Sequence, residues 1–485
     1  MNITELKPAL VWKFFHAINQ VPRPSKKEGK MREYLKSFAE EYHLPFKTDA
    51  CGNVLISKPA TKGMEDRVGV ILQGHMDMVC EKSNDVKHDF DKDPIQTVVD
   101  GEWVRAKGTT LGADDGMAVA SGLAILASED IPHGPLECLF TVDEEQGLTG
   151  AKNIEGGFMN GHILLNLDSE DEGQIFMGCA GGKDTIAYFH YTPAPAPSDL
   201  LYFRIDVKGL LGGHSGGEIH LERGNSIKIL ARFLNKLGEQ HPYTLCEIDG
   251  GNLHNVIPFE SHAVIGIDSD DKEKAISLLN IFAKDVENEL KHQDPKVSIT
   301  MMSTDKPAFM IDKKTTENLV SSLVACSHGV IGWSHEMAHL VETSTNLSSL
   351  KMRDGNKIEV ATMQRSSVES QREYISENVA ATFRLAGAEV IQSDGYPGWE
   401  PNMSSKILKT AIETYHKLFD KDPQVLAIHA GLECGLFLEK YPYLDMISIG
   451  PTMRNVHTPN ECIEIKSVDL FWKYLVALLK NIPVK

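Results

Sequence analysis

Nearly continuous apolar runs, each followed by polar or acidic residues, most constrain how this chain can fold. In the first third of the sequence they alternate with a helical pattern, in the order VGVILQGHMDMV, GMAVASGLAILAS, LECLFTVDEEQG and HILLNLDSED. Unbroken apolar runs are typical of strands buried on both faces of a parallel sheet, with helices on both sides. We therefore predict an α/β fold with a mixed, mostly parallel sheet covered by helices.

The pattern changes after GCAGGKD, which spans residues 178–184. Alternating segments such as DTIAYFHY and LYFRIDVKG predict half-buried strands, and KIEVATMQRSS predicts another. Amphipathic helices are expected over residues 227–237, 272–291 and 368–385. This part of the chain has an α+β pattern and indicates a second domain.

Pro and Gly cluster again in GYPGWEP, at residues 395–401, and the remainder returns to helix, strand and helix. We predict that residues 1–181 and 397–485 form one domain and that 182–396 form a domain inserted into it. A chain of 485 residues is long enough for two to four domains, so three consecutive domains remain an alternative.

The charge balance argues against some partners. The chain has 68 acidic and 49 basic residues, and its formal net charge of -19 repels phosphate backbones and anionic lipids. No apolar run approaches the roughly 18 residues of a membrane span, and no export signal is visible at the N-terminus. Eight cysteines without a CxxC pair suit a reducing compartment. We expect a cytoplasmic protein whose main partner is neither nucleic acid nor a membrane.

His75 and Asp77 follow an apolar strand in GHMDM. Residues two apart on a strand point to the same face, so the pair is spaced like a metal ligand and the carboxylate that orients it. Taken alone, such a pair is more often a structural hydrogen bond.

Paired acids occur twice more at the ends of predicted elements: Asp114 and Asp115 in GTTLGADDG, and Glu144 and Glu145 in VDEEQG. Carboxylates crowded near a buried strand end repel one another unless a cation or a proton compensates. Adjacent residues point in different directions, so one glutamate can bind metal while the other acts as a base. The alternatives are a helix N-cap at Asp115 and an exposed acidic turn.

Asp168 ends the strand-like ILLNLD, and His457 lies in a loop after another strand, in SIGPTMRNVHTPNE. Together the strand ends supply two imidazoles and three or four carboxylates, a suitable ligand set for two ions such as Zn²⁺. The charge of two divalent ions is balanced by Asp114, Glu145, Asp168 and one hydroxide ion. Two neighbouring ions need a shared ligand, and a carboxylate is the natural bridge.

With GHMDMV, GTTLGADDG, DEEQG, NLDSED, GGHSGGEIH and the late His457 in this order, the sequence resembles the M20 family of cocatalytic zinc peptidases over essentially its whole length. The resemblance implies two Zn²⁺ per chain, with Co²⁺ or Mn²⁺ as substitutes, and a cis peptide bond after the bridging aspartate. It assigns the bridge to Asp114, one site to His75 and Asp168, the other to Glu145 and His457, the orienting role to Asp77 and the general base to Glu144.

The inserted domain carries further residues that the resemblance assigns. His214, in KGLLGGHSGGEIH, corresponds to a histidine that stabilises the developing oxyanion, and Asn255 and Arg365 correspond to residues that hold the substrate. Arg365 suits a free C-terminal carboxylate. Glu433 is a candidate for the pocket wall, whereas His220, His254 and His429 are expected to be structural or to line the pocket.

The activity implied is that of a metallodipeptidase, which hydrolyses unblocked dipeptides including those with a C-terminal histidine. The same ligand set serves amidohydrolases and deacylases of the wider family that act on N-acyl amino acids, and this is the alternative. A relative that has lost activity and only binds its ligand is a third alternative.

The resemblance also implies a homodimer, and the glycines at residues 178–182 and near 398 predict that the inserted domain moves as a lid.

Overall fold

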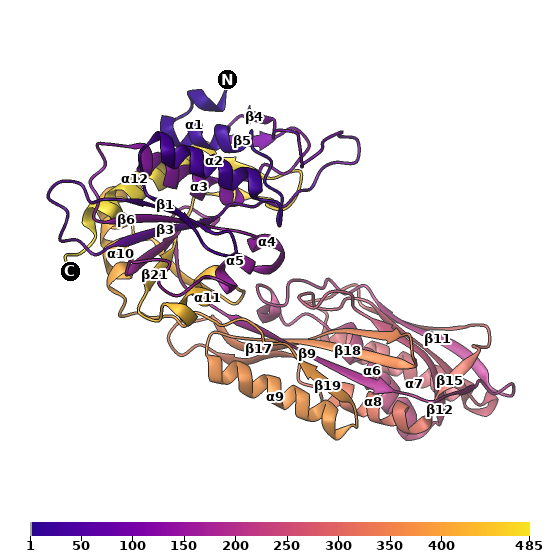
Figure 1. Ribbon diagram of the computed structural model, residues 1–485. Helices are drawn as coiled ribbons and strands as arrows, with labels where there is room; N and C mark the ends of the chain where they lie inside the picture. The colour runs from indigo at the N-terminus through magenta and orange to yellow at the C-terminus, as the bar shows by residue number, and fades with distance from the viewer. Residues whose placement is uncertain (1) are drawn as a thin grey trace. The chain divides into compact units, whose positions relative to one another are not determined.

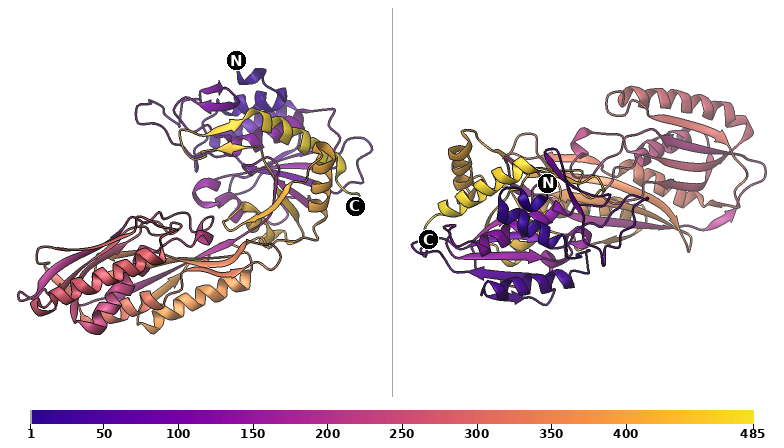
Figure 2. Two further views of the ribbon diagram at one scale, coloured as in Figure 1. Left: turned by 180° about the vertical axis from the view of Figure 1, so that it is seen from behind. Right: turned by 90° about the horizontal axis from the view of Figure 1, so that it is seen from above.

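The computed structural model describes residues 2–485 and divides the chain into two compact units. The first unit comprises the described residues up to Cys179 together with Trp399–Ala427 and Leu432–Lys485. The second comprises Ala180–Gly398 and the short segment Ile428–Gly431. Both ends of the chain therefore belong to the first unit, as Figure 2 also shows.

The first unit is built on an eight-stranded sheet in the order β1-β2-β6-β3-β7-β21-β8-β20. Strands β6, β3, β7 and β21 run parallel to one another at its centre, whereas β2 and β8 pair antiparallel on either side. All residues of β3, β6 and β7 are buried, which explains their unbroken apolar sequences. The strands of this sheet are β1 (Phe46–Thr48), β2 (Val54–Lys58), β3 (Val70–His75), β6 (Leu136–Thr141), β7 (Ile163–Asn166), β8 (Gln174–Cys179), β20 (Gln424–Ile428) and β21 (Asp445–Ser448).

Helices lie on both sides of this sheet, with α1, α2 and α3 above it and α11 below it in Figure 1. Gly74 of β3 allows α3 to pack closely, because a Cβ at this position would lie 2.5 Å from Ala118 Cβ. A small four-stranded sheet, β22-β23-β5-β4, completes the unit with strands β4 (Thr97–Asp100), β5 (Trp103–Ala106), β22 (Met453–Arg454) and β23 (Cys462–Glu464). The helices are η1 (Ile3–Glu5), α1 (Ala9–Ile18), α2 (Gly29–Glu41), α3 (Ala113–Ala127), α4 (Glu144–Gly147), α5 (Thr149–Lys152), α10 (Lys406–Phe419), α11 (Glu433–Lys440) and α12 (Ile465–Asn481).

The second unit is built on a larger sheet in the order β14-β11-β13-β12-β17-β18-β9-β19, and β16 also pairs with β17. Neighbouring strands are antiparallel, and a single residue pair, Gly250 with Leu350, joins β12 to β17. The strands are β9 (Gly181–His190), β11 (Leu201–Lys208), β12 (Tyr243–Gly250), β13 (Ser261–Ile267), β14 (Ser298–Ser303), β16 (Gly329–Trp333), β17 (Val341–Arg353), β18 (Lys357–Ser366) and β19 (Glu389–Gln392), with β10 (Pro193–Pro195) and β15 (Phe309–Ile311) as a separate pair.

Helices of the second unit bury their apolar residues against this sheet. In α6, Asn225 caps the first turn by accepting a hydrogen bond from the backbone N–H of Lys228, and Ile227, Leu230 and Leu234 recur on one buried face. The three helices expected from the sequence are confirmed as α6, α7 and α9, whereas α8 had not been predicted. The helices are η2 (Ile219–Leu221), α6 (Ser226–Gln240), η3 (Ser269–Asp271), α7 (Lys272–Glu289), α8 (Lys313–Ala325) and α9 (Glu369–Leu385).

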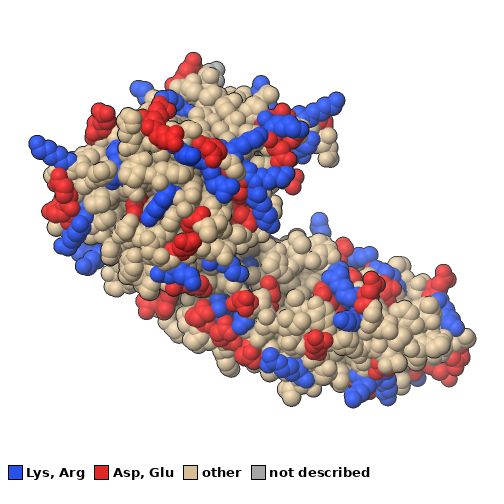
Figure 3. Space-filling model, in the orientation of Figure 1, with Lys and Arg blue, Asp and Glu red and all other residues tan. Residues whose placement is uncertain are grey.

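The predicted α/β class with a mixed sheet is thus confirmed. Acidic and basic side chains are interspersed on the face drawn in Figure 3. Among residues 2–485, no helix is long and apolar enough to span a membrane.

Candidate active site

The parallel strands bring the predicted metal ligands to one edge of the first sheet. His75 ends β3, the acidic segment of α4 follows β6, and Asp168 follows β7 by two residues. His75 pairs with Thr141, the last residue of β6, so these strand ends are in register. The carboxyl edge of a parallel sheet is where α/β proteins commonly bind ligands.

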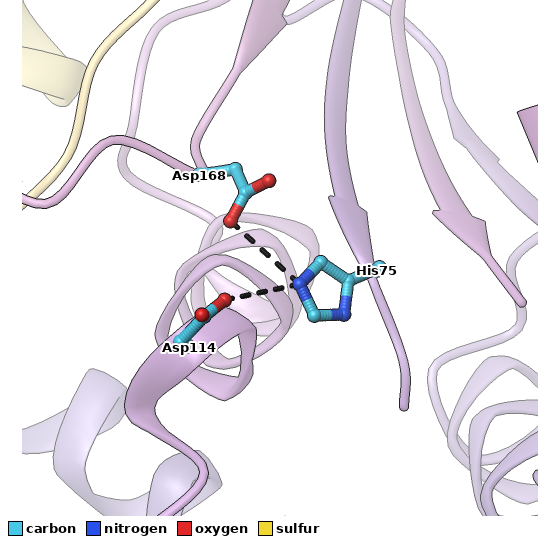
Figure 4. Close-up of side chains that lie close together, drawn as sticks. All are labelled: His75, Asp114 and Asp168. Atoms are coloured by element: carbon cyan, nitrogen blue, oxygen red, sulfur yellow. Dashed lines mark hydrogen bonds and ion pairs between the residues drawn. The ribbon is translucent and has the colours of Figure 1, made fainter. Parts of the chain in front are cut away.

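Figure 4 shows His75, Asp114 and Asp168 pointing toward one another. The Nε2 atom of His75 lies 3.0 Å from Oδ1 of Asp114 and 3.7 Å from Oδ1 of Asp168. These three side chains offer ligand atoms close enough together to hold one metal ion.

A second group of possible ligands contains Asp114, Glu145 and His457. The Nε2 atom of His457 lies 3.0 Å from Oδ2 of Asp114 and 3.0 Å from Oε2 of Glu145. Asp114 therefore belongs to both groups and presents a different oxygen to each imidazole. His75, Glu144 and Glu145 form a third group, which shares His75 with the first group and Glu145 with the second.

Asp77 lies behind His75 rather than in either ligand group. Its Oδ1 atom is 3.3 Å from Nδ1 of His75, the ring nitrogen that faces away from Asp114. It also accepts hydrogen bonds from the Ser25 hydroxyl and from the backbone N–H groups of Glu144 and Glu145. Burial opposes ionisation, but the interactions with His75 and Ser25 lower the pKa of Asp77 to about 2. Asp77 thus fixes the position of the His75 ring relative to the backbone of Glu144 and Glu145.

The site concentrates negative charge that the protein alone does not neutralise. Burial raises the pKa values of Glu144 and Asp168, and neighbouring carboxylates raise them further. Contacts with Asp114 and Glu145 raise the pKa of His457 to about 11. Among the described residues, the buried Oε1 atom of Glu145 has no hydrogen-bond partner. Imidazole nitrogens and carboxylate oxygens are ligands of Zn²⁺ and similar ions, so this donor set fits divalent metal.

Two buried residues that had not been singled out in the sequence position the Gly-rich turn before α3. The Glu461 carboxylate accepts hydrogen bonds from four consecutive backbone N–H groups, those of residues 111–114, at 2.7–3.3 Å. Arg23, only 2% exposed, donates to the carbonyl oxygens of Asp77 and Gly112. They tie the turn that carries Asp114 to the segment that carries Asp77. The Asp114–Asp115 peptide bond is cis, as the resemblance had implied.

A chain of buried polar side chains lies beneath the ligands. Gln73 donates to Glu433 at 2.6 Å and accepts from Asn166 at 2.6 Å. Gln73 and Asn166 each lie two residues before a candidate ligand, on β3 and β7. Glu433 is only 1% exposed and also accepts from Thr141, so it supports the strand ends and does not face an open pocket.

In the second unit, His214 is held in a defined tautomer. Its Nδ1 atom accepts hydrogen bonds from the backbone N–H groups of Gly216 and Gly217, at 3.2 and 3.0 Å. Burial and the nearby Arg365 lower the pKa of His214, which favours the neutral ring. Because Nδ1 is an acceptor, the proton of the neutral ring lies on Nε2, which is free to donate.

Arg365 lies close to the His214 loop. A Cβ at Gly216 would lie 3.3 Å from Arg365 Nε and 2.4 Å from the carbonyl oxygen of His429, so only glycine allows this approach. Arg365 is 4% exposed and donates to the hydroxyl of Tyr396 at 2.8 Å, and its buried Nε has no partner among residues 2–485. An unpaired donor on a buried cation is a feature of an anion-binding site.

Asn255 is connected to the same loop through the backbone. Its carbonyl oxygen accepts from Ser215 N–H at 2.8 Å, and Val256 pairs with His214. The three residues predicted in the inserted domain, His214, Asn255 and Arg365, thus cluster within the second unit. His429 bonds to the Ser344 hydroxyl at 2.7 Å, and burial followed by Arg365 lowers its pKa to about 3.

Residues 71–481 match the profile described as peptidase family M20/M25/M40, and the chain belongs to this family. It is therefore a hydrolase that acts on peptide bonds. It is 42% identical over 484 residues to the cytosol non-specific dipeptidase of Escherichia coli (strain K12), a match that covers 100% of both chains.

Among solved structures, an aminoacylhistidine dipeptidase from Vibrio alginolyticus has a TM-score of 0.94 and 42% sequence identity, covering 100% of this chain and 99% of the other. A tripeptidase from Staphylococcus aureus shares the fold at a TM-score of 0.58 and 15% identity, with 98% and 99% covered. The resemblance to the M20 family that the motifs indicated is confirmed.

Proposed function

We propose that this chain is a di-zinc metallopeptidase that hydrolyses the peptide bond of unblocked dipeptides, including dipeptides with a C-terminal histidine. The observation that supports two ions most directly is the position of Asp114, whose two oxygens each lie 3.0 Å from a different imidazole. The names of the two 42%-identical relatives, both dipeptidases, support the substrate class.

In this proposal one zinc ion is held by His75, Asp114 and Asp168, and the other by Asp114, Glu145 and His457. Asp114 is the shared ligand, and Co²⁺ or Mn²⁺ can substitute for Zn²⁺. When bound, the two ions polarise the scissile carbonyl group and increase the acidity of a water molecule.

The protein's own groups then move the proton. Glu144 lies beside the ligands, with Oε2 4.0 Å from Nε2 of His75, and we assign it the role of general base. It takes a proton from the attacking water and passes it to the leaving amine. Its raised pKa suits a group that must first accept and then donate. Asp77 keeps His75 in the orientation that presents Nε2 to the site.

The second unit contributes substrate recognition in this proposal. The Nε2–H group of His214 donates to the oxyanion that develops from the scissile carbonyl, and Arg365 binds the free C-terminal carboxylate of the dipeptide. Asn255 contacts the substrate backbone. The supporting observations are the fixed tautomer of His214 and the unpaired Nε of Arg365.

A substrate panel tests the proposal. Chelated protein restored with Zn²⁺, Co²⁺ or Mn²⁺ is assayed with β-alanyl-histidine, ordinary unblocked dipeptides, N-acetylated dipeptides and N-acetyl amino acids. We expect hydrolysis of the unblocked dipeptides and little or no hydrolysis of the acetylated compounds. Faster cleavage of N-acetyl amino acids would assign the chain to the deacylases of the wider family instead. Binding without turnover with every metal would indicate a relative that has lost activity.

Two further properties belong to the proposal. We place the protein in the cytoplasm, on the name of the Escherichia coli relative and the eight free cysteines. We also propose a homodimer, which light scattering of the purified protein would test by a molar mass twice that of the 53.7 kDa chain.

A further inference from the structure

A cavity of about 910 Å³ lies in the second unit, outside the candidate active site. It is bounded by α6, α8, the start of β12 and β15, elements that Figure 1 labels close together. Its volume is within the range of small-molecule binding sites in proteins.

This cavity is separate from the substrate residues proposed above. Tyr243, the first residue of β12, lines it, whereas the loop that contains Asn255 follows the far end of the strand at Gly250. Tyr243 and Gly250 are seven residues apart along β12, and at about 3.3 Å per residue they are separated by about 23 Å. A ligand in the cavity therefore does not occupy the position of a dipeptide held by His214 and Arg365.

The floor of the cavity is apolar. Leu234, Met310, Ile311 and Val320 contribute aliphatic surface, and Tyr243 contributes an aromatic ring. The ring packs against Gly238, where a Cβ would lie 3.2 Å from Tyr243 Cε1. Burial raises the pKa of the Tyr243 hydroxyl, and the nearby Glu317 carboxylate raises it further, so this hydroxyl stays neutral.

The rim of the cavity is strongly acidic. Its charged lining residues are the carboxylates Glu239, Asp268, Asp270, Asp271 and Glu317, against the single lysine Lys313. Asp271 is paired with His241 and Lys274, whereas Glu317 has only the exposed Lys313, 3.7 Å away. An apolar floor beneath an acidic rim matches a molecule with an apolar body and a positively charged end.

We propose that this cavity is a second small-molecule site, which binds an organic ammonium ion with an aromatic or aliphatic body and no carboxylate. The floor removes the apolar body from water, and the rim stabilises the ammonium group. A carboxylate on the ligand would face the same acidic rim and be repelled. The site therefore discriminates against amino acids and dipeptides, the compounds that occupy the active site.

Isothermal titration calorimetry of the full-length, zinc-loaded protein tests the proposal with tryptamine as the probe. Indole-3-propionate has the same ring with the opposite charge, and tryptophan adds a carboxylate to the amine. We expect saturable binding of one tryptamine per chain and at least about ten-fold weaker binding of the other two compounds. No saturable binding up to about 1 mM tryptamine, or equal affinity for the three compounds, would overturn the proposal.

Paired variants locate the bound amine. Glu317→Gln with Asp270→Asn removes rim charge, and Ser321→Trp places a large side chain at the exposed edge of the cavity. Each should weaken tryptamine binding at least about ten-fold. The controls on α7, Asp285→Asn with Glu287→Gln and Ser277→Trp, change exposed residues away from the cavity and should bind tryptamine like the wild type.

All four proteins should keep the wild-type melting temperature and dipeptide turnover, because none of these residues belongs to the proposed active site. A folded cavity variant with undiminished tryptamine affinity would show that the amine binds elsewhere and would refute the assignment. If a cavity variant fails to fold, the fallback is a competition experiment on the wild-type protein with a tightly bound dipeptide analogue. Displacement of tryptamine by the analogue would place the amine in the active site and would also refute the proposal.

Discussion

Asp114 differs from the other acidic residues of the site because each of its oxygens faces a different imidazole. Glu144 and Glu145 are neighbours in sequence, yet only Glu145 lies 3.0 Å from His457. Adjacent acidic residues thus have different surroundings. We therefore expect some substitutions to release bound metal and others to lower the catalytic rate without releasing metal.

We expect Glu144→Gln to lower kcat by about 10²–10⁴-fold, because it removes a proton-transfer group without removing a proposed ligand. Zinc content, measured by mass spectrometry of the desalted protein, should stay at the wild-type value. Glu145→Gln is the matched variant and should lose bound zinc. Loss of zinc in Glu144→Gln with retention in Glu145→Gln would reverse the two assignments.

His214→Ala should lower kcat by about 10²–10³-fold, since it removes the proposed hydrogen-bond donor to the developing oxyanion. KM and zinc content should change little, and steady-state kinetics separates these effects. His292→Ala, at an exposed histidine of the second unit with no assigned role, serves as the control and should retain full activity. A change in KM alone would indicate that His214 contributes only to substrate binding.

Zinc affinity should increase with pH. Without metal, Asp114 and Glu145 raise the pKa of His457 to about 11, and the neighbouring carboxylates raise the pKa of His75 despite its burial. Both rings therefore hold a proton at neutral pH, and zinc must displace it. We expect about a ten-fold gain in affinity per pH unit for each proton displaced between about pH 6.5 and 7.5. Competition with a chelator measures the zinc affinity at each pH. Uptake of protons on zinc binding, or a zinc affinity that does not change with pH, would contradict the expectation.

Among the structural elements, the turn before α3 depends most on distant contacts. A single carboxylate, Glu461, satisfies four consecutive backbone N–H groups of this turn, and Arg23 binds the carbonyl oxygen of Gly112. Replacement of the carboxylate leaves buried donors without a partner. The turn should then lose its shape before the sheet does.

Glu461→Gln keeps the size of the side chain but leaves only one oxygen to accept hydrogen bonds. We expect it to weaken zinc affinity by about 10–100-fold, the usual effect of disturbing groups that position metal ligands, and to lower the melting temperature. Glu102→Gln, at an exposed position in the same unit, is the control. Wild-type zinc affinity in Glu461→Gln would show that the turn does not need this carboxylate.

The sequence allows His75, Asp114, Glu145 and Asp168 to be predicted because they lie at or near the end of a hydrophobic strand or at the start of a helix, where local pattern is informative. His457 lies in a loop, and its role followed from the family resemblance. The sequence could not reveal Glu461 or Arg23, whose partners lie 347–350 and 53–89 residues away. Helices α6, α7 and α9 followed from apolar periodicity. Helix α8 was missed because its sequence, KKTTENLVSSLVA, contains several polar and β-branched residues.

At the scale of the whole molecule, the chain crosses between the two units four times, at residues 179–180, 398–399, 427–428 and 431–432. The first two crossings lie in paired antiparallel segments. Within the first unit Cys179 pairs with Trp399, and within the second Gly182 pairs with Tyr396. A Cβ at Gly181 would lie 2.5 Å from the backbone nitrogen of Gly398. These glycines coincide with the hinge positions expected from the sequence, and the paired segments would have to bend together.

We therefore predict that a non-hydrolysable dipeptide analogue decreases the radius of gyration of the zinc-loaded protein, as measured by small-angle X-ray scattering. Gly181→Val should reduce this change, because a side chain at this position would clash with the facing segment. Gly156→Val is the control, because a Cβ at Gly156 meets no neighbour within 4 Å and the backbone there does not have a positive φ. Indistinguishable scattering with and without the analogue would contradict a moving lid.

The position of β21 in the first sheet has a consequence for synthesis of the protein. This strand, residues 445–448, lies between β7 and β8, which the ribosome produces more than 260 residues earlier. Nearly all of the second unit emerges in that interval, so it can fold while the first sheet still lacks a central strand. His457 emerges later still. In the proposed assignment, nascent and prematurely terminated chains therefore lack one of the proposed metal ligands, and we expect peptide hydrolysis to begin only when synthesis is almost finished.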